Sequence, residues 1–180
     1  MNRIVILLFS VLLLFSCNKA EPRKPVIRKT STFMKESIER NQKINQLEEE
    51  ILRLKLQKDS VNNYITSDFG FWYFYNQKDS LTASLPETGD EVLFTYEVKR
   101  INDSIVFNES QIGDQSYIVD KQELITGLQD GIKLMKEGET VTFLFPSHKA
   151  YGYSGAEGIN PNEPLIYKVK LKKIIKNKSD

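Results

Sequence analysis

Three runs of alternating apolar and polar residues constrain the fold of this chain more than any other feature. The apolar positions are Val92, Phe94, Tyr96 and Val98; Val141, Phe143 and Phe145; and Leu165, Tyr167, Val169 and Leu171. Successive side chains of a strand point to opposite faces, so each run predicts a strand with one apolar and one polar face. Such strands are typical of an antiparallel sheet that covers its core on one side only.

One helix is expected between these strands. Asp120 and Glu123 have the spacing of a near capping box, which places the start of the helix at Asp120. An apolar stripe follows, made of Leu124, Leu128, Ile132 and Met135. Gly127 and Gly131 lie inside this helix, where each costs about 1 kcal/mol relative to Ala, so its bare face should lie very close to the sheet. A short helix across a curved antiparallel sheet is an α+β half-barrel.

A long amphipathic helix is expected over residues 32–66, upstream of the sheet. No Gly or Pro occurs between Ser31 and Phe69. Apolar residues recur at a 3-4 spacing, at Ile44, Leu47, Ile51, Leu54, Val61 and Ile65. This stripe could form a parallel coiled coil in a homodimer, or it could pack on the chain's own domain, and the spacing leaves both possibilities open.

The first residues have the pattern of an export signal. Arg3 precedes an apolar run, Ile4 to Phe15, which would span about 18 Å as a helix, too short for a hydrocarbon core of about 30 Å. Residues 1–16 therefore read as a signal peptide. The ending Leu14-Phe15-Ser16-Cys17 resembles the lipobox of bacterial lipoproteins, with Phe15 bulkier than usual.

The lipobox resemblance implies a membrane partner. Acylation of Cys17 would anchor the chain in the bacterial cell envelope, facing the periplasm. An ordinary signal peptide, or an uncleaved anchor with an incidental Cys, is the alternative. Residues 17–31 carry five basic residues, one acidic residue and two prolines, and so predict a basic flexible tether.

Charge and composition exclude several classes of function. The formal net charge is +1, from 25 Lys and Arg against 24 Asp and Glu, which argues against a nucleic-acid-binding protein. A single Cys cannot form an internal disulfide, and with a single His the chain lacks the ligands of a typical zinc site. We therefore expect no nucleic-acid partner, no metal and no cofactor.

Ordered motifs in the C-terminal half resemble the FKBP family of peptidyl-prolyl isomerases. They are Gly89-Asp90-Glu91 before Phe94-Thr95-Tyr96, Phe107-Asn108-Glu109-Ser110, Leu124-Ile125-x-Gly127-Leu128-x-x-Gly131, Met135-x-x-Gly138-Glu139, Ala150-Tyr151-Gly152, and Gly158-Ile159-x-Pro161. The resemblance implies an FKBP-like isomerase domain over residues 67–176, a tail at 177–180, and proline-containing polypeptides as substrates. The anchor, the helix and the aromatic run 69–75 resemble the gliding-motility-associated FKBP-type lipoproteins of the Bacteroidetes.

The resemblance also implies a proline pocket. It assigns catalytic positions to Tyr96, Phe107, Asn108 and Tyr151, and substrate contacts to Leu124, Ile125, Leu128, Ile159 and Tyr167. In the family, the backbone N–H at the place of Ile125 and the hydroxyl at the place of Tyr151 donate hydrogen bonds. Asn108 replaces the usual Asp, Leu128 replaces the Trp of some members, and Gln115 replaces an aromatic wall residue.

The chemistry of isomerisation needs none of the groups that the sequence lacks. Rotation about an Xaa-Pro bond breaks no bond, and the twisted transition state is less polar at the C–N bond than the planar amide. A dry aromatic pocket with one or two fixed donors favours that state. A membrane-tethered enzyme that assists exported proteins, and a weakly catalytic or non-catalytic chaperone in an envelope assembly, both remain open.

Overall fold

The computed structural model describes residues 30–78 and 84–177. Two compact units divide the chain, Met1–Ser37 and Ile38–Asp180. In the first unit only the opening turns of helix α2 are described, and the contacts reported below belong to the second. The expected signal peptide (1–16), Cys17 and the tether up to residue 29 lie outside the described residues. Within the described residues, no helix is both long enough and apolar enough to cross a bilayer.

The elements are four helices and seven strands within the described residues. The helices are α2 (Thr30–Lys58), α3 (Glu109–Ile112), α4 (Thr126–Ile132) and the 3₁₀ turn η2 (Ser147–Lys149). The strands are β1 (Ile65–Thr66), β2 (Trp72–Gln77), β3 (Glu91–Arg100), β4 (Ile105–Phe107), β5 (Gln115–Ile118), β6 (Thr140–Phe145) and β7 (Leu165–Ile175).

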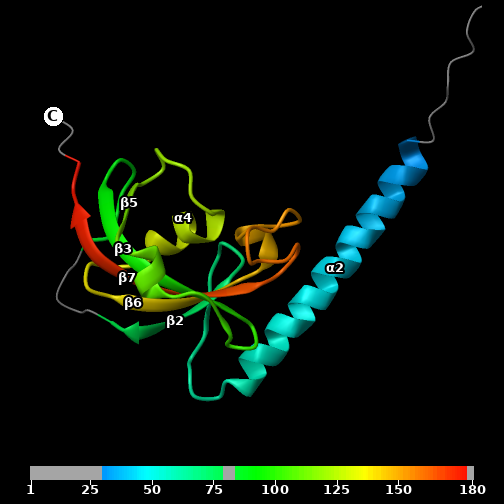
Figure 1. Ribbon diagram of the computed structural model, residues 1–180, viewed down its shortest axis with the longest axis horizontal. Helices are drawn as coiled ribbons and strands as arrows, with labels where there is room; N and C mark the ends of the chain where they lie inside the picture. The colour runs from blue at the N-terminus through cyan, green and yellow to red at the C-terminus, as the bar shows by residue number, and fades with distance from the viewer. Residues whose placement is uncertain (1–29, 79–83, 178–180) are drawn as a thin grey trace, which may run out of the picture. The chain divides into compact units, whose positions relative to one another are not determined.

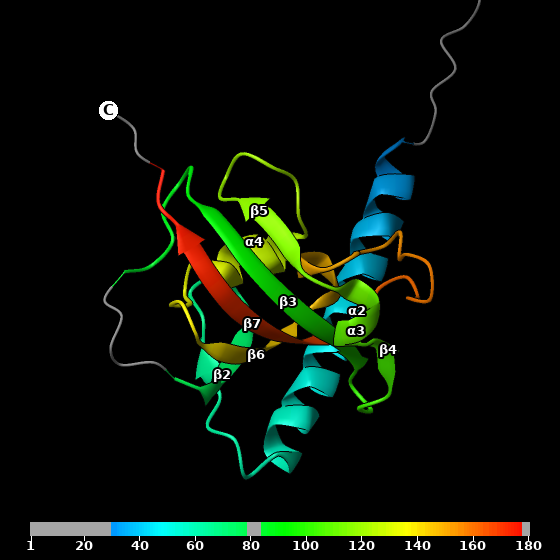
Figure 2. The same cartoon turned by 60° about the vertical axis from the view of Figure 1, so that its left-hand side comes forward.

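The strands form one antiparallel sheet in the order β1-β2-β6-β7-β3-β4, and β5 also pairs with β3. Figures 1 and 2 show β3, β7 and β6 side by side as a curved sheet, with α4 across one face. The last strand, β7, therefore lies between β3 and β6. The expected α+β class, with a curved antiparallel sheet, one short helix and a long N-terminal helix, is confirmed.

The apolar positions of the three alternating runs form the main core beneath α4. Phe143 and Phe145 of β6 are fully buried, together with Leu128 and Ile132 of the helix. A Cβ added to Gly127 would lie 2.8 Å from the Phe145 ring and 2.9 Å from the Lys149 carbonyl oxygen, and one added to Gly131 would lie 3.0 Å from the Phe143 ring. The expected close approach of the helix to the sheet is confirmed.

Helix α4 begins at Thr126, so the start expected at Asp120 was wrong. Asp120 has a left-handed backbone (φ 59°), which is unsuited to a helix N-cap, and lies in the turn after β5. Its carboxylate accepts a hydrogen bond from the Thr88 hydroxyl at 2.6 Å and pairs with Lys133 at 2.5 Å. The acidic side chain thus contacts neighbouring segments and leaves the first turn of the helix uncapped.

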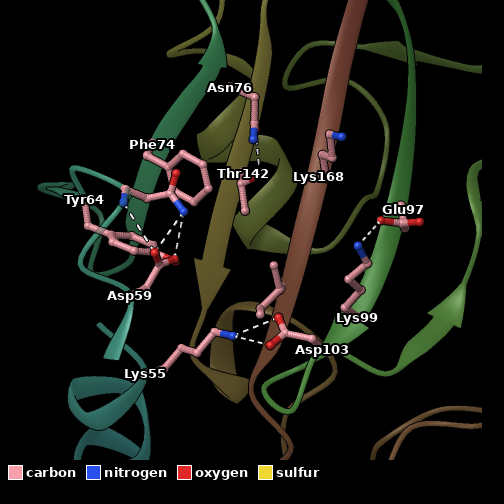
Figure 3. Close-up of a pocket in the computed structure, with 12 residues that line it drawn as sticks. Lys55, Asp59, Tyr64, Phe74, Asn76, Glu97, Lys99, Asp103, Thr142 and Lys168 are labelled. Atoms are coloured by element: carbon pink, nitrogen blue, oxygen red, sulfur yellow. Dashed lines mark hydrogen bonds and ion pairs between the residues drawn. The ribbon is translucent and has the colours of Figure 1, made fainter. Parts of the chain in front are cut away.

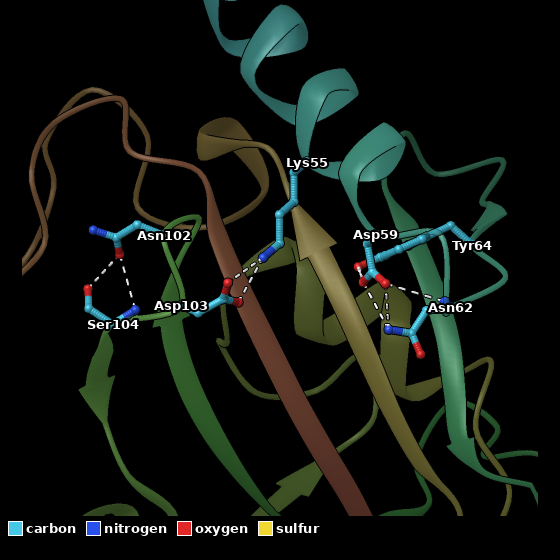
Figure 4. A network of polar contacts seen from close by, with 7 residues as sticks. All are labelled: Lys55, Asp59, Asn62, Tyr64, Asn102, Asp103 and Ser104. Atoms are coloured by element: carbon cyan, nitrogen blue, oxygen red, sulfur yellow. Dashed lines mark hydrogen bonds and ion pairs between the residues drawn. The ribbon is translucent and has the colours of Figure 1, made fainter.

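Helix α2 ends at Lys58, eight residues before the expected end at residue 66. The Asp59 carboxylate accepts hydrogen bonds from the Asn62 side-chain amide, at 2.9 and 3.0 Å, and from the Tyr64 hydroxyl, at 2.9 Å (Figure 4). These local bonds hold the chain in a turn after the helix. Val61 is consequently exposed outside the helix, and Ile65 pairs with Tyr73 in the sheet.

The outer face of the sheet carries a second, smaller core, so the expectation of a core on one side only was wrong there. Leu52 of α2 is buried against Leu144 of β6 and Ile166 of β7. Lys55 adds an ion pair with Asp103, in the turn between β3 and β4, at 2.6 Å. This part of α2 therefore packs on the chain's own domain, which was one of the two possibilities that the sequence left open.

The apolar stripe that suggested a coiled coil includes Ile51, the residue next to Leu52, and so lies on a different face of α2. Leu47, Ile51 and Leu54 remain 53%, 47% and 44% exposed. The face of α2 that packs on the sheet is therefore distinct from the face that the heptad spacing identified.

Candidate active site

Tyrosine and phenylalanine rings from adjacent strands lie together on the α4 side of the sheet. Tyr96 of β3 and Tyr167 of β7 stack with ring centroids 5.5 Å apart. Phe94 lies 5.9 Å from Tyr96, and Phe145 of β6 lies 5.4 Å from Tyr167. The period of two brings these rings to one face of three neighbouring strands.

Tyr151 reaches the same wall from the turn after η2. Burial first, and then the neighbouring Tyr151, raise the pKa of both Tyr96 and Tyr167. Phenols are protonated at neutral pH even with their usual pKa, and the raised pKa values of Tyr96 and Tyr167 extend this state to more alkaline pH, so that each hydroxyl can donate a hydrogen bond. The three tyrosines thus converge, although they are separated by up to 71 residues in the sequence.

The hydroxyl of Tyr167 is buried without a hydrogen-bond partner among the described residues. An unpaired buried polar group costs about 1–3 kcal/mol, so such groups in native proteins need an explanation. A polar group of a bound molecule could pair with it.

The segment before α4 packs against the same core as the three tyrosines. Ile125 is the N-cap residue, and its carbonyl accepts hydrogen bonds from the N–H groups of Leu128 and Gln129. No described residue accepts a hydrogen bond from the Ile125 N–H, which leaves it available as a donor. Leu124 packs against the core beside it, and Leu128 and Ile159 are buried at 1% and 5% exposure.

The remaining expected positions are less directly connected to the tyrosines. Phe107, at the end of β4, is half-buried and packs against the core. Asn108 is the N-cap of α3, and its side-chain oxygen accepts hydrogen bonds from the Gln111 N–H and the Ser110 hydroxyl. The Gln115 amide donates to the Ile112 carbonyl at 2.9 Å. The hydrogen bonds of these two polar side chains are therefore local.

This geometry agrees with the comparison to known sequences. Residues 82–172 match the family of FKBP-type peptidyl-prolyl cis-trans isomerases. The chain belongs to this family.

Among its relatives, this FKBP-type chain is 33% identical over 127 residues to a probable FKBP-type peptidyl-prolyl cis-trans isomerase FkpA of Neisseria meningitidis, covering 70% of the chain and 44% of the relative. It is 39% identical over 87 residues to the peptidyl-prolyl cis-trans isomerase Mip of Coxiella burnetii, covering 48% of the chain and 37% of the relative. The chain thus spans less than half the length of these curated relatives.

Solved structures share the fold of this FKBP-type chain. The crystal structure of FkpA from Escherichia coli superposes with a TM-score of 0.60 at 20% identity, covering 97% of this chain and 81% of that one. An isomerase structure from Pseudomonas syringae gives a TM-score of 0.61 at 20% identity, covering 75% and 96% respectively. The expected FKBP-like fold is confirmed.

A cavity of the FKBP-type chain lies on the outer face of its sheet, beside the end of α2 (Figure 3). It encloses about 230 Å³ and has a mixed polar lining. Its charged groups largely pair with one another: Lys55 with Asp103, and Lys99 with Glu97 at 2.6 Å. Among the residues that the structure describes, no group of three or more His, Cys, Asp or Glu side chains is placed to hold a metal ion. The three convergent tyrosines therefore remain the candidate active site.

Sequence reasoning missed one residue near this site. Glu48 of α2 bonds to Ser147, at the start of the turn that leads to Tyr151. Glu48 lies in a run of charged helix residues, and nothing in that pattern distinguishes it from its exposed neighbours.

Proposed function

We propose that the chain accelerates the cis–trans isomerisation of Xaa-Pro bonds in polypeptides. The observation that carries this proposal is the convergence of Tyr96, Tyr151 and Tyr167 on one core, against which Ile125 also packs with its N–H unpaired among the described residues. Rotation of a peptide bond faces a barrier of about 18–20 kcal/mol, and water stabilises the planar, polar ground state more than the twisted state. A dry pocket removes that preference.

Each side chain has a defined part in this mechanism. Leu128 and Ile159 contact the proline ring, and the aromatic rings exclude water from the rotating bond. The Ile125 N–H and the Tyr151 hydroxyl donate to carbonyl groups of the bound peptide and fix the chain on either side of that bond. No proton is transferred, so the phenols need only stay protonated.

Replacing Tyr151 by Phe tests the donor. Loss of one hydrogen bond made in the transition state should lower kcat/KM for an Xaa-Pro tetrapeptide by about tenfold, as measured by NMR exchange. Tyr153→Phe is the matched control, since Tyr153 is 85% exposed, and its rate should stay unchanged. A Tyr151→Phe rate equal to that of the unaltered chain would contradict the role of the hydroxyl.

A weakly catalytic or non-catalytic chaperone is the second candidate, and the local bonding of Asn108 and Gln115 favours it. These residues leave one side of the pocket without the groups usual in the family. The distinguishing measurement is the refolding of a protein limited by proline isomerisation, run beside tetrapeptide exchange. Acceleration of neither, together with suppressed aggregation of the refolding protein, would identify a binding module.

We further propose that the chain is tethered to a bacterial membrane through acylated Cys17 and acts on exported proteins in the periplasm. The lipobox resemblance and the short apolar segment before it support this proposal. Cys17→Ser should move the chain from the membrane fraction to the soluble fraction, and unchanged fractionation would contradict acylation. The resemblance of the flanking segments supports clients in the gliding machinery, which a gliding assay of a deletion strain would test.

We also propose a homodimer through the exposed stripe Leu47, Ile51 and Leu54. The three side chains lie on one face of α2 at the spacing of a coiled-coil seam. Sedimentation at tens of micromolar should give a dimer, and Ile51→Lys should give a monomer. A monomeric unaltered chain would exclude the coil.

A further inference from the structure

A buried carboxylate on α2 binds the turn that leads to Tyr151. Glu48 and Ser147 are 5% and 4% exposed, respectively. The Ser147 backbone N–H donates to one carboxylate oxygen of Glu48, and the Ser147 hydroxyl donates to the other at 2.8 Å. Hydrogen bonds to an ionised acceptor are about twice as strong as neutral ones.

Ser147 in turn holds the backbone on both sides of Tyr151. Its carbonyl oxygen accepts from the N–H of Ala150 at 2.9 Å and from the N–H of Gly152 at 2.8 Å. The Gly152 carbonyl then accepts from the Asn162 N–H at 2.8 Å. Two hydrogen-bonding steps therefore connect Glu48 with the residues that flank the Tyr151 ring.

We propose that Glu48 is a positioning residue for the isomerase reaction, which holds the Tyr151 hydroxyl in its working place through Ser147. This inference rests on the function proposed above. Glu48 lies outside residues 82–172, the part of the chain that matches the isomerase family, so it adds to the site a contribution from the N-terminal helix.

The physical reason is that Ser147 has no other partner for its donors in the described structure. Without the carboxylate, a buried N–H and a buried hydroxyl would be left unpaired, and the turn would shift to reach water. The turn keeps a second attachment to the domain, because the Lys149 side chain pairs with Asp130 of α4 at 2.9 Å. The displacement is therefore local to residues 147–152, where a shift of about 1 Å is enough to impair catalysis strongly.

Four variants of the full-length chain, kept in detergent, test the inference. Glu48→Leu removes both acceptors, and Glu48→Gln keeps an acceptor for the Ser147 N–H. Glu49→Gln makes the same chemical change at an exposed neighbour. Lys55→Met, a fourth variant, removes the ion pair to Asp103 and so loosens α2 at a different point (Figure 4).

Two readouts are measured for each variant: kcat/KM on an Xaa-Pro tetrapeptide, and the hydrogen-exchange rates of the Ala150 and Gly152 amides. We expect Glu48→Leu to lower kcat/KM about tenfold and to speed exchange of these two amides, while exchange in β7 stays unchanged. Glu48→Gln should recover the rate to within about threefold of the unaltered chain. Glu49→Gln and Lys55→Met should match the unaltered chain.

Several results would overturn the proposal. One is full activity in Glu48→Leu, and another is an equal loss in Lys55→Met, which would assign the effect to general docking of the helix. Faster exchange throughout the sheet would mean that Glu48 serves overall stability alone. Failure of the proposed function is a separate result: the unaltered chain would then show no catalysis, while the exchange of Ala150 and Gly152 would still report whether Glu48 holds the turn.

Discussion

Two buried tyrosines of this domain should respond in opposite directions to the loss of a hydroxyl. Tyr167 is fully buried, and its hydroxyl has no hydrogen-bond partner among the described residues. Tyr117 is 2% exposed, and its hydroxyl accepts a hydrogen bond from the Asp120 N–H at 3.1 Å. Tyr167→Phe removes an unpaired polar atom from the core, so it should raise the free energy of unfolding by about 1 kcal/mol.

Tyr117→Phe is the matched control, since it removes a hydroxyl that has a partner. It should lower the free energy of unfolding by about 1 kcal/mol, because the bond is lost and the Asp120 N–H is left without its acceptor. Each kcal/mol corresponds to about 2–4 °C in Tm for a domain of this size. The two variants should therefore differ by roughly 2 kcal/mol in urea unfolding and should lie on opposite sides of the unaltered chain.

The assay is equilibrium unfolding in urea, monitored by fluorescence. For each variant, the dependence of the unfolding free energy on urea concentration (the m-value) is compared with that of the unaltered chain. Unequal m-values would signal a change in the unfolded state. The urea midpoints of two variants are therefore compared only where their m-values are equal. A loss of 1 kcal/mol or more in Tyr167→Phe would refute the reasoning, because it would mean that the hydroxyl has a partner in the free protein.

Two further predictions concern stability. Asp90 is 3% exposed, and its burial alone would raise the pKa of its carboxyl. Hydrogen bonds from the N–H groups of Glu87 and Asn177 and from the Lys176 side chain outweigh this effect. The pKa of the Asp90 carboxyl is therefore below its usual value. Asp90→Asn should therefore lower the free energy of unfolding by about 2 kcal/mol at pH 7. This difference from the unaltered chain should disappear as the pH falls through the lowered pKa of Asp90 in the folded state. A difference that grew in acid would contradict the lowered pKa. Leu52→Ala should cost about 2–5 kcal/mol in urea unfolding, against less than about 0.5 for Gln46→Ala at an exposed position of α2 outside the apolar stripe. Similar small losses in both variants would contradict the packing of α2 on the sheet.

The strands could be predicted because their side chains alternate between the core and the opposite face of the sheet. Phe94, Phe143 and Tyr167 lie at alternate positions, and the period of two is visible in the chain without knowledge of its neighbours. The pocket residues could be proposed only through family motifs. Tyr96, Tyr151 and Tyr167 have no common spacing in the sequence, and the sheet and the turn after η2 bring them together.

The errors concern contacts between segments that are distant in the sequence. Asp120 resembles a helix cap, and its partners Thr88 and Lys133 lie in other segments that no local pattern identifies. The outer core escaped prediction because Leu144 and Ile166 occupy positions on the mainly polar face of their strands. A helix more than 80 residues away covers them, and only the folded chain shows this.

The place of β7 has a consequence for how the chain is made. Synthesis proceeds from the N-terminus, and β7 is the last strand described, yet it lies between β3 and β6. It pairs with β3 over residues 165–175 and with β6 over residues 165–170. The halves of the sheet cannot join before residues 165–175 are available, so the domain closes its core only after its last described strand has been made. For the same reason, a premature stop within β7 would remove the centre of the sheet, and such a product is expected to be degraded before it can fold.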